Sequence, residues 1–214
     1  MHRAVNETMF FLKVYRICSA VWKKIRPYHA IVLTFQAGPI KKDISTPAII
    51  ARVNFNNIMD ADEYEPPQKI KSFYRFLSEG DIGYYAYLNG RFVHRSWVTF
   101  GPKKVTRWNY LAPFWIRENE AVIHWCETVP DARGNNIYPA VLSEIKKDLK
   151  AEAIYIFTTL DNISSIRGIA KAGFVLVDVT RVVGILGFSF NVKVNRDKIS
   201  EKVRVYFENS STSA

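Results

Sequence analysis

The chain has 214 residues, and 30 Lys and Arg against 20 Asp and Glu give it a formal net charge of +10. Hydrophobic residues make up 48% of it and aromatic residues 14%, which excludes a disordered chain and is enough for the core of one domain. Only two cysteines, Cys18 and Cys126, are present. They exclude a disulfide scaffold and a cysteine-rich zinc module, and they favour a reducing, cytoplasmic setting.

The N-terminal part predicts an amphipathic helix over residues 7–26, because apolar side chains recur every three or four residues and Lys and Arg fill the other side. Pro27 should end it. Two interpretations stay open: a helix that packs on the domain with a solvated basic face, or one that lies peripherally on the anionic inner face of a membrane. No stretch reaches the roughly 20 uncharged residues of a membrane span. We therefore expect a helical extension over 1–29, a main domain over 30–208 and a flexible Ser-rich tail over 209–214.

The first half of the main domain predicts mostly strands. Strands are expected over 30–36 and 48–55, followed by an acidic loop or broken helix over 56–68 and a helix from Ile70 to Leu77 that Gly80 ends. The Asn89-Gly90 pair between two apolar runs predicts a β-hairpin. Residues 101–119 are expected to form a loop whose aromatic residues, Trp108 to Trp115, either pack beneath it or wall a pocket for an acceptor.

The second half alternates strands and helices. The expected order is a strand over 121–128, a helix over 136–149, a strand over 153–159, a helix over 162–172 and two strands over 174–183 and 185–194. Asp161 or Asn162 should cap the second helix. Strand, helix and strand over 121–159 form a crossover unit that pairs its strands in parallel. The fold class is therefore α/β or α+β, with a mixed sheet.

The turn before the first of these helices carries Arg133, Gly134, Asn135 and Asn136. A helix start presents unpaired backbone N–H groups and the positive end of the helix dipole, which together bind phosphate. Gly and Asn tolerate the backbone angles of such a turn, and Arg133 can add charge-assisted hydrogen bonds. The alternative is a structural turn that binds nothing.

This turn and a later segment, 161–174, together resemble the GNAT superfamily of acyl-CoA-dependent N-acyltransferases. Pro130 and Arg133 fit the first motif of the family, and Asn162, Gly173 and Phe174 fit the second. The resemblance covers about residues 48–195 and implies a mixed, partly antiparallel central sheet flanked by helices.

The resemblance also implies a ligand and its contacts. Acetyl-CoA would be the cosubstrate, with no metal, and the backbone of Cys126, Glu127 and Thr128 would pair with its pantetheine arm. Asn162 would bond the same arm. The backbone N–H groups of the turn and helix start would hold the pyrophosphate: Arg133, Gly134, Asn135, Asn136, Ile137 and Tyr138. The family's glycine falls on Asn136 and its second small residue on Tyr138, whose ring leaves room for a diphosphate only by pointing away from the turn.

The implied reaction is direct attack of a small-molecule amine, for example an amino sugar or a cell-envelope precursor, on the thioester in a ternary complex. The family's tyrosine acid falls on Ile169, and a glutamate found in its fifth strand falls on Phe157, so neither role carries over. The glutamate base of its fourth strand falls on Val122. Strand alternation places Glu120, Val122, His124, Cys126 and Thr128 on one face, which makes Glu120 and His124 the candidate catalytic residues.

His124 suits base catalysis because an ordinary histidine titrates at about pH 6.5. A half-buried structural histidine is the alternative for His124. His94, on the strand expected after the Asn89-Gly90 turn, is a further candidate that could also touch the acceptor. A Cys126 acyl-enzyme is a minor alternative.

Two other functions compete with the enzyme: a non-catalytic acyl-CoA-binding protein on the same scaffold, and a basic membrane-surface module. We expect no nucleic-acid partner, because the basic residues are scattered and no nucleic-acid motif is present. The sequence leaves a monomer and a homodimer open.

Overall fold

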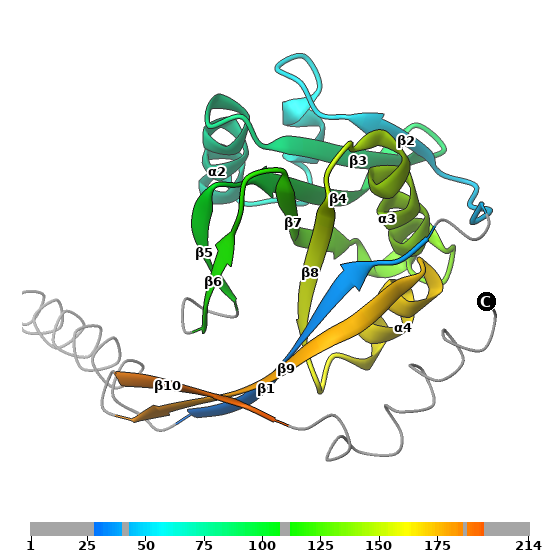
Figure 1. Ribbon diagram of the computed structural model, residues 1–214. Helices are drawn as coiled ribbons and strands as arrows, with labels where there is room; N and C mark the ends of the chain where they lie inside the picture. Colours follow the sequence, from blue (N-terminus) through cyan, green and yellow to red (C-terminus); the bar gives the residue numbers. More distant parts are fainter. Residues whose placement is uncertain (1–27, 40–42, 108–111, 186–187, 195–214) are drawn as a thin grey trace, which may run out of the picture.

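The computed structural model describes residues 28–39, 43–107, 112–185 and 188–194 (Figure 1). These residues form ten strands and three α-helices. The strands are β1 (Tyr28–Ala37), β2 (Ile49–Arg52), β3 (Ile82–Leu88), β4 (Arg91–Phe100), β5 (Lys103–Arg107), β6 (Ala112–Ile116), β7 (Glu120–Thr128), β8 (Ala153–Thr159), β9 (Phe174–Ile185) and β10 (Phe188–Lys193). The helices are α2 (Pro67–Ser78), α3 (Ile137–Asp148) and α4 (Ile163–Lys171), with short 3-10 turns η1 (Ile58–Ala61) and η2 (Pro130–Ala132).

Eight strands form one sheet in the order β10-β9-β1-β8-β7-β4-β3-β2. Every neighbouring pair is antiparallel except β7 and β8, which run parallel on either side of the α3 crossover. This confirms the mixed α/β sheet and the parallel unit that the sequence predicted.

The helices cover both faces of the sheet. On β4, Trp97 stacks on Phe73 of α2 with ring centroids 5.4 Å apart, whereas the ring of His94 lies 5.8 Å from Tyr138 of α3. Alternating positions of a strand point to opposite faces, so α2 covers one face and α3 the other. Helix α4 packs beside α3 and against β9 (Figure 1).

Local signals explain where the elements begin and end. Asn89 and Gly90 both adopt positive φ, 53° and 77°, as a tight turn between β3 and β4 requires. Helix α2 begins at Pro67, a position where the N–H that proline lacks would have no helical partner. The helix therefore starts about one turn before Ile70, where the apolar spacing placed it. Asn162 caps α4, because its side chain accepts from the Ser165 backbone N–H.

The loop expected over 101–119 is wrong in its central part, where β5 and β6 form a two-stranded antiparallel sheet of their own. Its paired residues run from Lys103 opposite Ile116 to Arg107 opposite Ala112. Phe114 packs against Tyr155 and Phe157 of β8, at 5.1 and 5.0 Å between ring centroids. The prolines at 102 and 113 mask the strand pattern, because proline is tolerated only at strand starts and on edge strands.

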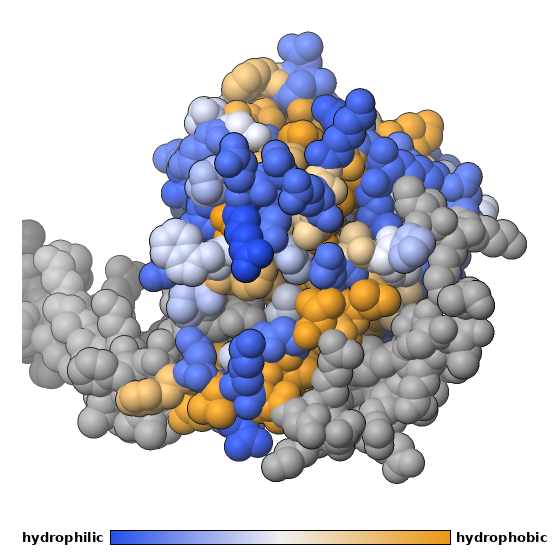
Figure 2. Space-filling model, viewed as in Figure 1, coloured by the Kyte–Doolittle hydropathy of each residue, from blue (hydrophilic) through white to orange (hydrophobic). Residues whose placement is uncertain are grey.

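The surface is uneven in polarity (Figure 2). Hydrophilic side chains predominate around α2, whereas hydrophobic side chains follow β1 and β9 in the lower half of the view. Val175, Phe190 and Val192, on β9 and β10, are among the exposed large hydrophobic residues.

Several expectations fall on residues that the structure does not describe. These are the helix over 7–26, Cys18, Trp108, Tyr110 and the tail over 209–214. Among the described residues, none of the helices has the length and apolar character needed to cross a membrane.

Candidate functional site

The parallel strands β7 and β8 separate partway along their length. They pair from Glu120 opposite Ala153 to Ile123 opposite Ile156, and their register ends there. Beyond that point β7 stays paired with β4 as far as Thr128, and β8 stays paired with β1 as far as Thr159. Two inner strands that part in this way leave backbone edges facing a gap, and buried backbone groups of this kind need partners.

A β-bulge begins where the strands part. Trp125 has a φ of 51°, and β4 meets β7 with Arg95 opposite Glu127 but Trp97 opposite His124, so β7 carries one extra residue. His124 and Trp125 consequently both face α2, with their rings 5.1 and 5.2 Å from Phe76.

The bulge corrects the prediction that Glu120, Val122, His124, Cys126 and Thr128 share one face of β7. Simple alternation holds only as far as His124. Thr128 lies on the α3 face, where its hydroxyl contacts the His94 ring at 2.7 Å. Cys126 shares that face, since its thiol is close enough to Tyr138 of α3 to raise the pKa of that phenol. The sequence gives no sign of the bulge, because the residue with positive φ is Trp125 and not a glycine.

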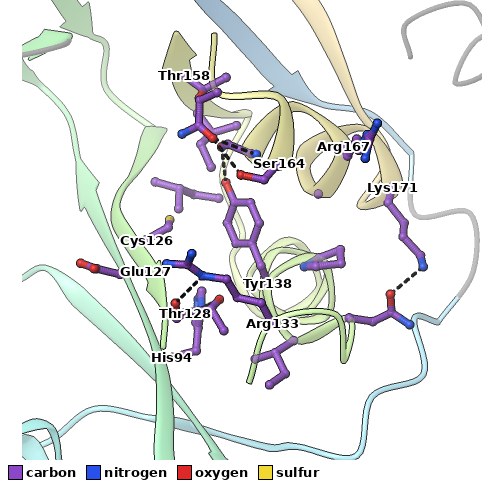
Figure 3. A pocket seen from close by; sticks show the side chains of 18 of the residues that line it. His94, Cys126, Glu127, Thr128, Arg133, Tyr138, Thr158, Ser164, Arg167 and Lys171 are labelled. Carbon is purple, nitrogen blue, oxygen red and sulfur yellow. Dashed lines mark hydrogen bonds between the residues drawn. The ribbon is translucent and has the colours of Figure 1, made fainter. Parts of the chain in front are cut away.

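A pocket of about 1180 Å³ lies where the two strands separate (Figure 3). Its lining comes from five places: His94 of β4, the end of β7, the turn and first residues of α3, the end of β8, and α4 with its cap Asn162. The lining residues are His94, Ile123, His124, Trp125, Cys126, Glu127, Thr128, Ala132, Arg133, Gly134, Asn136, Ile137, Tyr138, Pro139, Ile156, Phe157, Thr158, Asn162, Ser164, Ser165, Arg167, Gly168 and Lys171.

Most of the residues predicted to bind the cosubstrate therefore gather at one place. Cys126, Glu127, Thr128, Arg133, Gly134, Asn136, Ile137, Tyr138 and Asn162 all line the pocket. Asn135 does not. Its side-chain amide donates to the Ala132 carbonyl at 3.1 Å, and its own carbonyl accepts from Thr46.

The turn into α3 presents its N–H groups as expected. Gly134 and Asn136 adopt φ of 88° and 56°, which Gly and Asn tolerate best, and this bend brings the chain into the helix. No hydrogen bond within the described residues engages the backbone N–H of Gly134, Asn135 or Asn136. Lys171 holds the Asn136 side chain at 2.7 Å, and the Arg133 Nε donates to the Thr128 carbonyl at 3.2 Å.

The Tyr138 ring points away from this turn (Figure 3). It lies against Gly168 of α4, where an added Cβ would stand 2.5 Å from the ring, and its hydroxyl is 3.3 Å from the Ser165 hydroxyl. Burial, and then the nearby Cys126 thiol, raise the pKa of Tyr138 well above that of a free phenol. The bulky residue at a position where the family has a small one is accommodated because α4 supplies a glycine.

A buried polar chain lies on the α3 side of the pocket. The His94 ring contacts Thr128 through Nδ1 at 2.7 Å and Ser96 through Nε2 at 2.8 Å, and the residue is fully buried. Burial, and then the charge of Arg95, lower the pKa of His94 to about 3, so the ring stays neutral. Burial raises the pKa of Cys126 to about 11, which disfavours the thiolate that an acyl-cysteine route needs.

A second cluster, which the sequence did not reveal, lies on the α2 side. The buried Arg95 guanidinium pairs with the buried Glu65 carboxylate and, at 2.5 Å, with Glu127. It also donates to the Trp125 carbonyl and lies over the Phe73 ring. Its position predicts a structural role, since buried charges persist only when they are paired.

The two candidate catalytic residues differ in position. His124 lines the pocket, and its Nε2 lies 3.3 Å from an Asp81 carboxylate oxygen. Glu120 is not among the lining residues, because its carboxylate accepts from the Arg117 N–H at 2.9 Å and from the Tyr155 hydroxyl at 3.4 Å.

The positions at which the family has other acids or bases are apolar and packed. Val122 and Ile169 are buried, and Phe157 packs against Phe114. Phe114 and Trp115 do not line the pocket. Among the described residues there is no group of three or more His, Cys, Asp or Glu that would hold a metal ion.

Comparison with known proteins shows similarity in structure only. No family model matches the chain, and no curated protein matches its sequence. A protein from Novosphingobium aromaticivorans DSM 12444, assigned to the GNAT family of acetyltransferases, superposes with a TM-score of 0.52 at 18% identity, covering 75% of this chain and 67% of its own. A GNAT-family acetyltransferase from Colwellia psychrerythraea gives a TM-score of 0.52 at 13% identity, covering 86% and 62%. The fold is GNAT-like.

A third similar structure has no known function. It is a conserved protein from Staphylococcus epidermidis ATCC 12228, with a TM-score of 0.50 at 10% identity, covering 76% of this chain and 64% of its own. The chain thus spans about two thirds of the length of these structures. At such identities the likeness establishes the fold alone.

Proposed function

We propose that this protein is an acyl-CoA-dependent N-acyltransferase that moves an acetyl group from acetyl-CoA to the amine of a small molecule, in a ternary complex. The observation that carries the proposal is the pocket between β7 and β8, which runs from an open strand edge to the N-terminus of α3. An extended thiol arm suits the first part, and a diphosphate suits the second.

The contacts follow from the groups that are available. The open edge of β7 from Cys126 to Thr128 would pair with the amides of the pantetheine arm. The N–H groups from Gly134 to Tyr138 would hold the pyrophosphate, with Arg133 beside them. The Asn162 Oδ1 already accepts from the Ser165 N–H at 3.2 Å, so its side-chain NH₂ is the group left for the ligand.

The chemistry needs mainly positioning and one base. A base takes a proton from the acceptor's ammonium, and the neutral amine attacks the thioester carbonyl. The C–S bond then breaks, the nitrogen gives its second proton to the departing CoA sulfur, and an amide and CoA thiol result. His124 is our candidate base, because it lines the pocket where the strands part.

The acceptor would approach from the α2 side. Trp125 and Glu127 both lie on that side. Trp125 is 37% exposed, and the side chain of Glu127 is 51% exposed. An aromatic plane beside a carboxylate suits a small amine, such as an amino sugar or a cell-envelope precursor.

The first test is calorimetry with CoA and acetyl-CoA, comparing the wild type with Arg133→Ala. Removing a charge-assisted hydrogen bond costs about 1.5–3 kcal/mol, so Kd for CoA should rise about 10–100-fold. Arg75→Ala is the matched control, because Arg75 is an exposed α2 arginine outside the pocket lining whose ion pair is with the neighbouring Glu79. An absence of CoA binding, or equal effects of the two variants, would overturn the proposed site.

The second test is release of CoA thiol from acetyl-CoA across a panel of amines that includes amino sugars. Turnover supports the enzyme. The buried Ile169 and the packed Phe157 favour the alternative, a non-catalytic acyl-CoA-binding protein. Tight CoA binding with no turnover over the whole panel would establish that alternative.

A further inference from the structure

Asp81 is a buried carboxylate whose place is fixed by the end of α2. Gly80 turns the chain with a φ of 85°, and the Asp81 N–H donates to the Phe76 carbonyl at 2.9 Å, as at a glycine-terminated helix end. The side chain is only 5% exposed. A helix C-terminus disfavours negative charge and burial disfavours it further, so this carboxylate requires partners from other elements.

The ionisable partners are two side chains. The His124 Nε2 of β7 lies 3.3 Å from Oδ2, and the Lys103 Nζ of β5 lies 3.6 Å from Oδ1. Burial alone would raise the pKa of Asp81, but contacts with His124 and Thr99 and the charge of Lys103 outweigh it, and the pKa is lowered. Asp81 is therefore an anion beside the imidazole.

His124 is thereby held on both sides of its ring. Phe76 lies edge-to-face at 5.1 Å, and Asp81 faces Nε2. The Nε2 contact is at ion-pair distance but misses the geometry of a full hydrogen bond. The anion favours the tautomer with the proton on Nε2, which leaves the lone pair on Nδ1.

His124 stands at the point where β7 and β8 part. It follows Ile123, the last residue of β7 that pairs with β8, and its side chain is 23% exposed and lines the pocket. Nε2 itself is buried against Asp81, so the exposed part of the side chain lies elsewhere on the ring.

We propose that Asp81 is a positioning residue that orients and electrostatically supports His124 as the base that deprotonates the acceptor's amine. The inference rests on the proposed acyl transfer. The proton moves from the ammonium nitrogen to Nδ1, the imidazolium is stabilised by the Asp81 anion, and the proton later passes to water. Asp81 itself stays ionised throughout.

The direct test follows the titration of His124 by NMR in the ligand-free protein, so it does not depend on turnover. The chain has four histidines, and loss of one signal in His124→Gln assigns the resonance. In Asp81→Asn the His124 resonance should titrate at lower pH than in the wild type, because an adjacent opposite charge is lost. Asp81→Asn leaves the other charged groups of this region in place. These are Lys103, which faces Asp81, and the Arg95–Glu127 pair beyond the bulge.

The control is Asp148→Asn, which removes a carboxylate that pairs with Arg52 at the other end of α3. It should leave the His124 titration unchanged. An unchanged His124 titration in folded Asp81→Asn would overturn the proposal. If Asp81→Asn does not fold, Lys103→Met serves instead. That variant removes the Lys103 cation that faces Asp81, so His124 should titrate at higher pH than in the wild type, and no change would again contradict the pairing.

The enzymatic test uses an amine that the thiol-release panel identifies. Asp81→Asn should lower kcat about 10–100-fold, as loss of support for a general base does, and shift the acid limb of the kcat–pH profile. Kd for acetyl-CoA should stay within twofold. Adding Asp81→Asn to His124→Gln should cost nothing more. A shifted NMR titration without any turnover would refute the proposed function and leave the pairing intact. Turnover with an unshifted acid limb would refute the positioning role alone.

Discussion

Gly168 and Tyr138 offer a test in which the sign of the effect, and not only its size, is fixed by the structure. A Cβ at position 168 would lie 2.5 Å from Tyr138 Cδ1 and 2.8 Å from Cε1, and Gly168 is buried within α4. Gly168→Ala should cost about 1–3 kcal/mol by overpacking but gain about 1 kcal/mol from helix propensity. The net expectation is destabilisation of about 0–2 kcal/mol.

In the Tyr138→Ala background the clash is gone and only the gain in helix propensity remains. Gly168→Ala should then stabilise the protein by up to about 1 kcal/mol, a reversal of sign. Urea denaturation of the four proteins in the cycle measures it, with an expected coupling of about 1–3 kcal/mol. Equal effects of Gly168→Ala in the two backgrounds would refute the placement of the ring against α4. Calorimetry with CoA adds a functional readout, since a ring displaced from Gly168 enters the pocket and weakens binding.

Two further predictions concern buried charge. The pKa of His94, lowered to about 3, lies below that of an unfolded histidine, so the unfolded state binds more protons between about pH 3 and 6.5. Stability should therefore rise with pH across this window, by up to about 1.4 kcal/mol per unit, and His94→Gln should flatten the slope in urea denaturation whereas exposed His29→Gln should not. Glu65→Ala leaves buried Arg95 with only the half-exposed Glu127 as a carboxylate partner, and should destabilise the protein by about 3–5 kcal/mol in the same assay. A loss below about 1 kcal/mol would contradict the pairing.

Much of the fold could be predicted because its signals are local. The Asn89-Gly90 turn predicted the β3–β4 hairpin, and the order of strand, helix and strand predicted the parallel pairing of β7 with β8. The Asn162 cap and the left-handed Asn136 follow from residue chemistry that sequence alone displays. The pocket-lining positions of the turn into α3 follow from the same local reasoning.

What the sequence did not predict depends on contacts between distant segments. Asp81 lies at a helix end that has no visible relation to His124 until β3, β4 and β7 are side by side. The β5–β6 hairpin was hidden by its prolines. The bulge at Trp125 was missed because strand alternation was extended through it, and a single extra residue changes which face every later side chain occupies.

The bulge links the buried ion cluster around Arg95 to the site. Trp125 has no partner in the β4–β7 register, and its carbonyl accepts from the buried Arg95 guanidinium. Arg95 is in turn held by Glu65, from the segment just before α2. The ion cluster is therefore what satisfies the irregular backbone there. Because of that irregularity, His124 faces α2 and Asp81, whereas Thr128 faces α3. One strand end thus presents the His124 imidazole to one side of the pocket and the Thr128 hydroxyl to the other, which unbroken alternation would not allow.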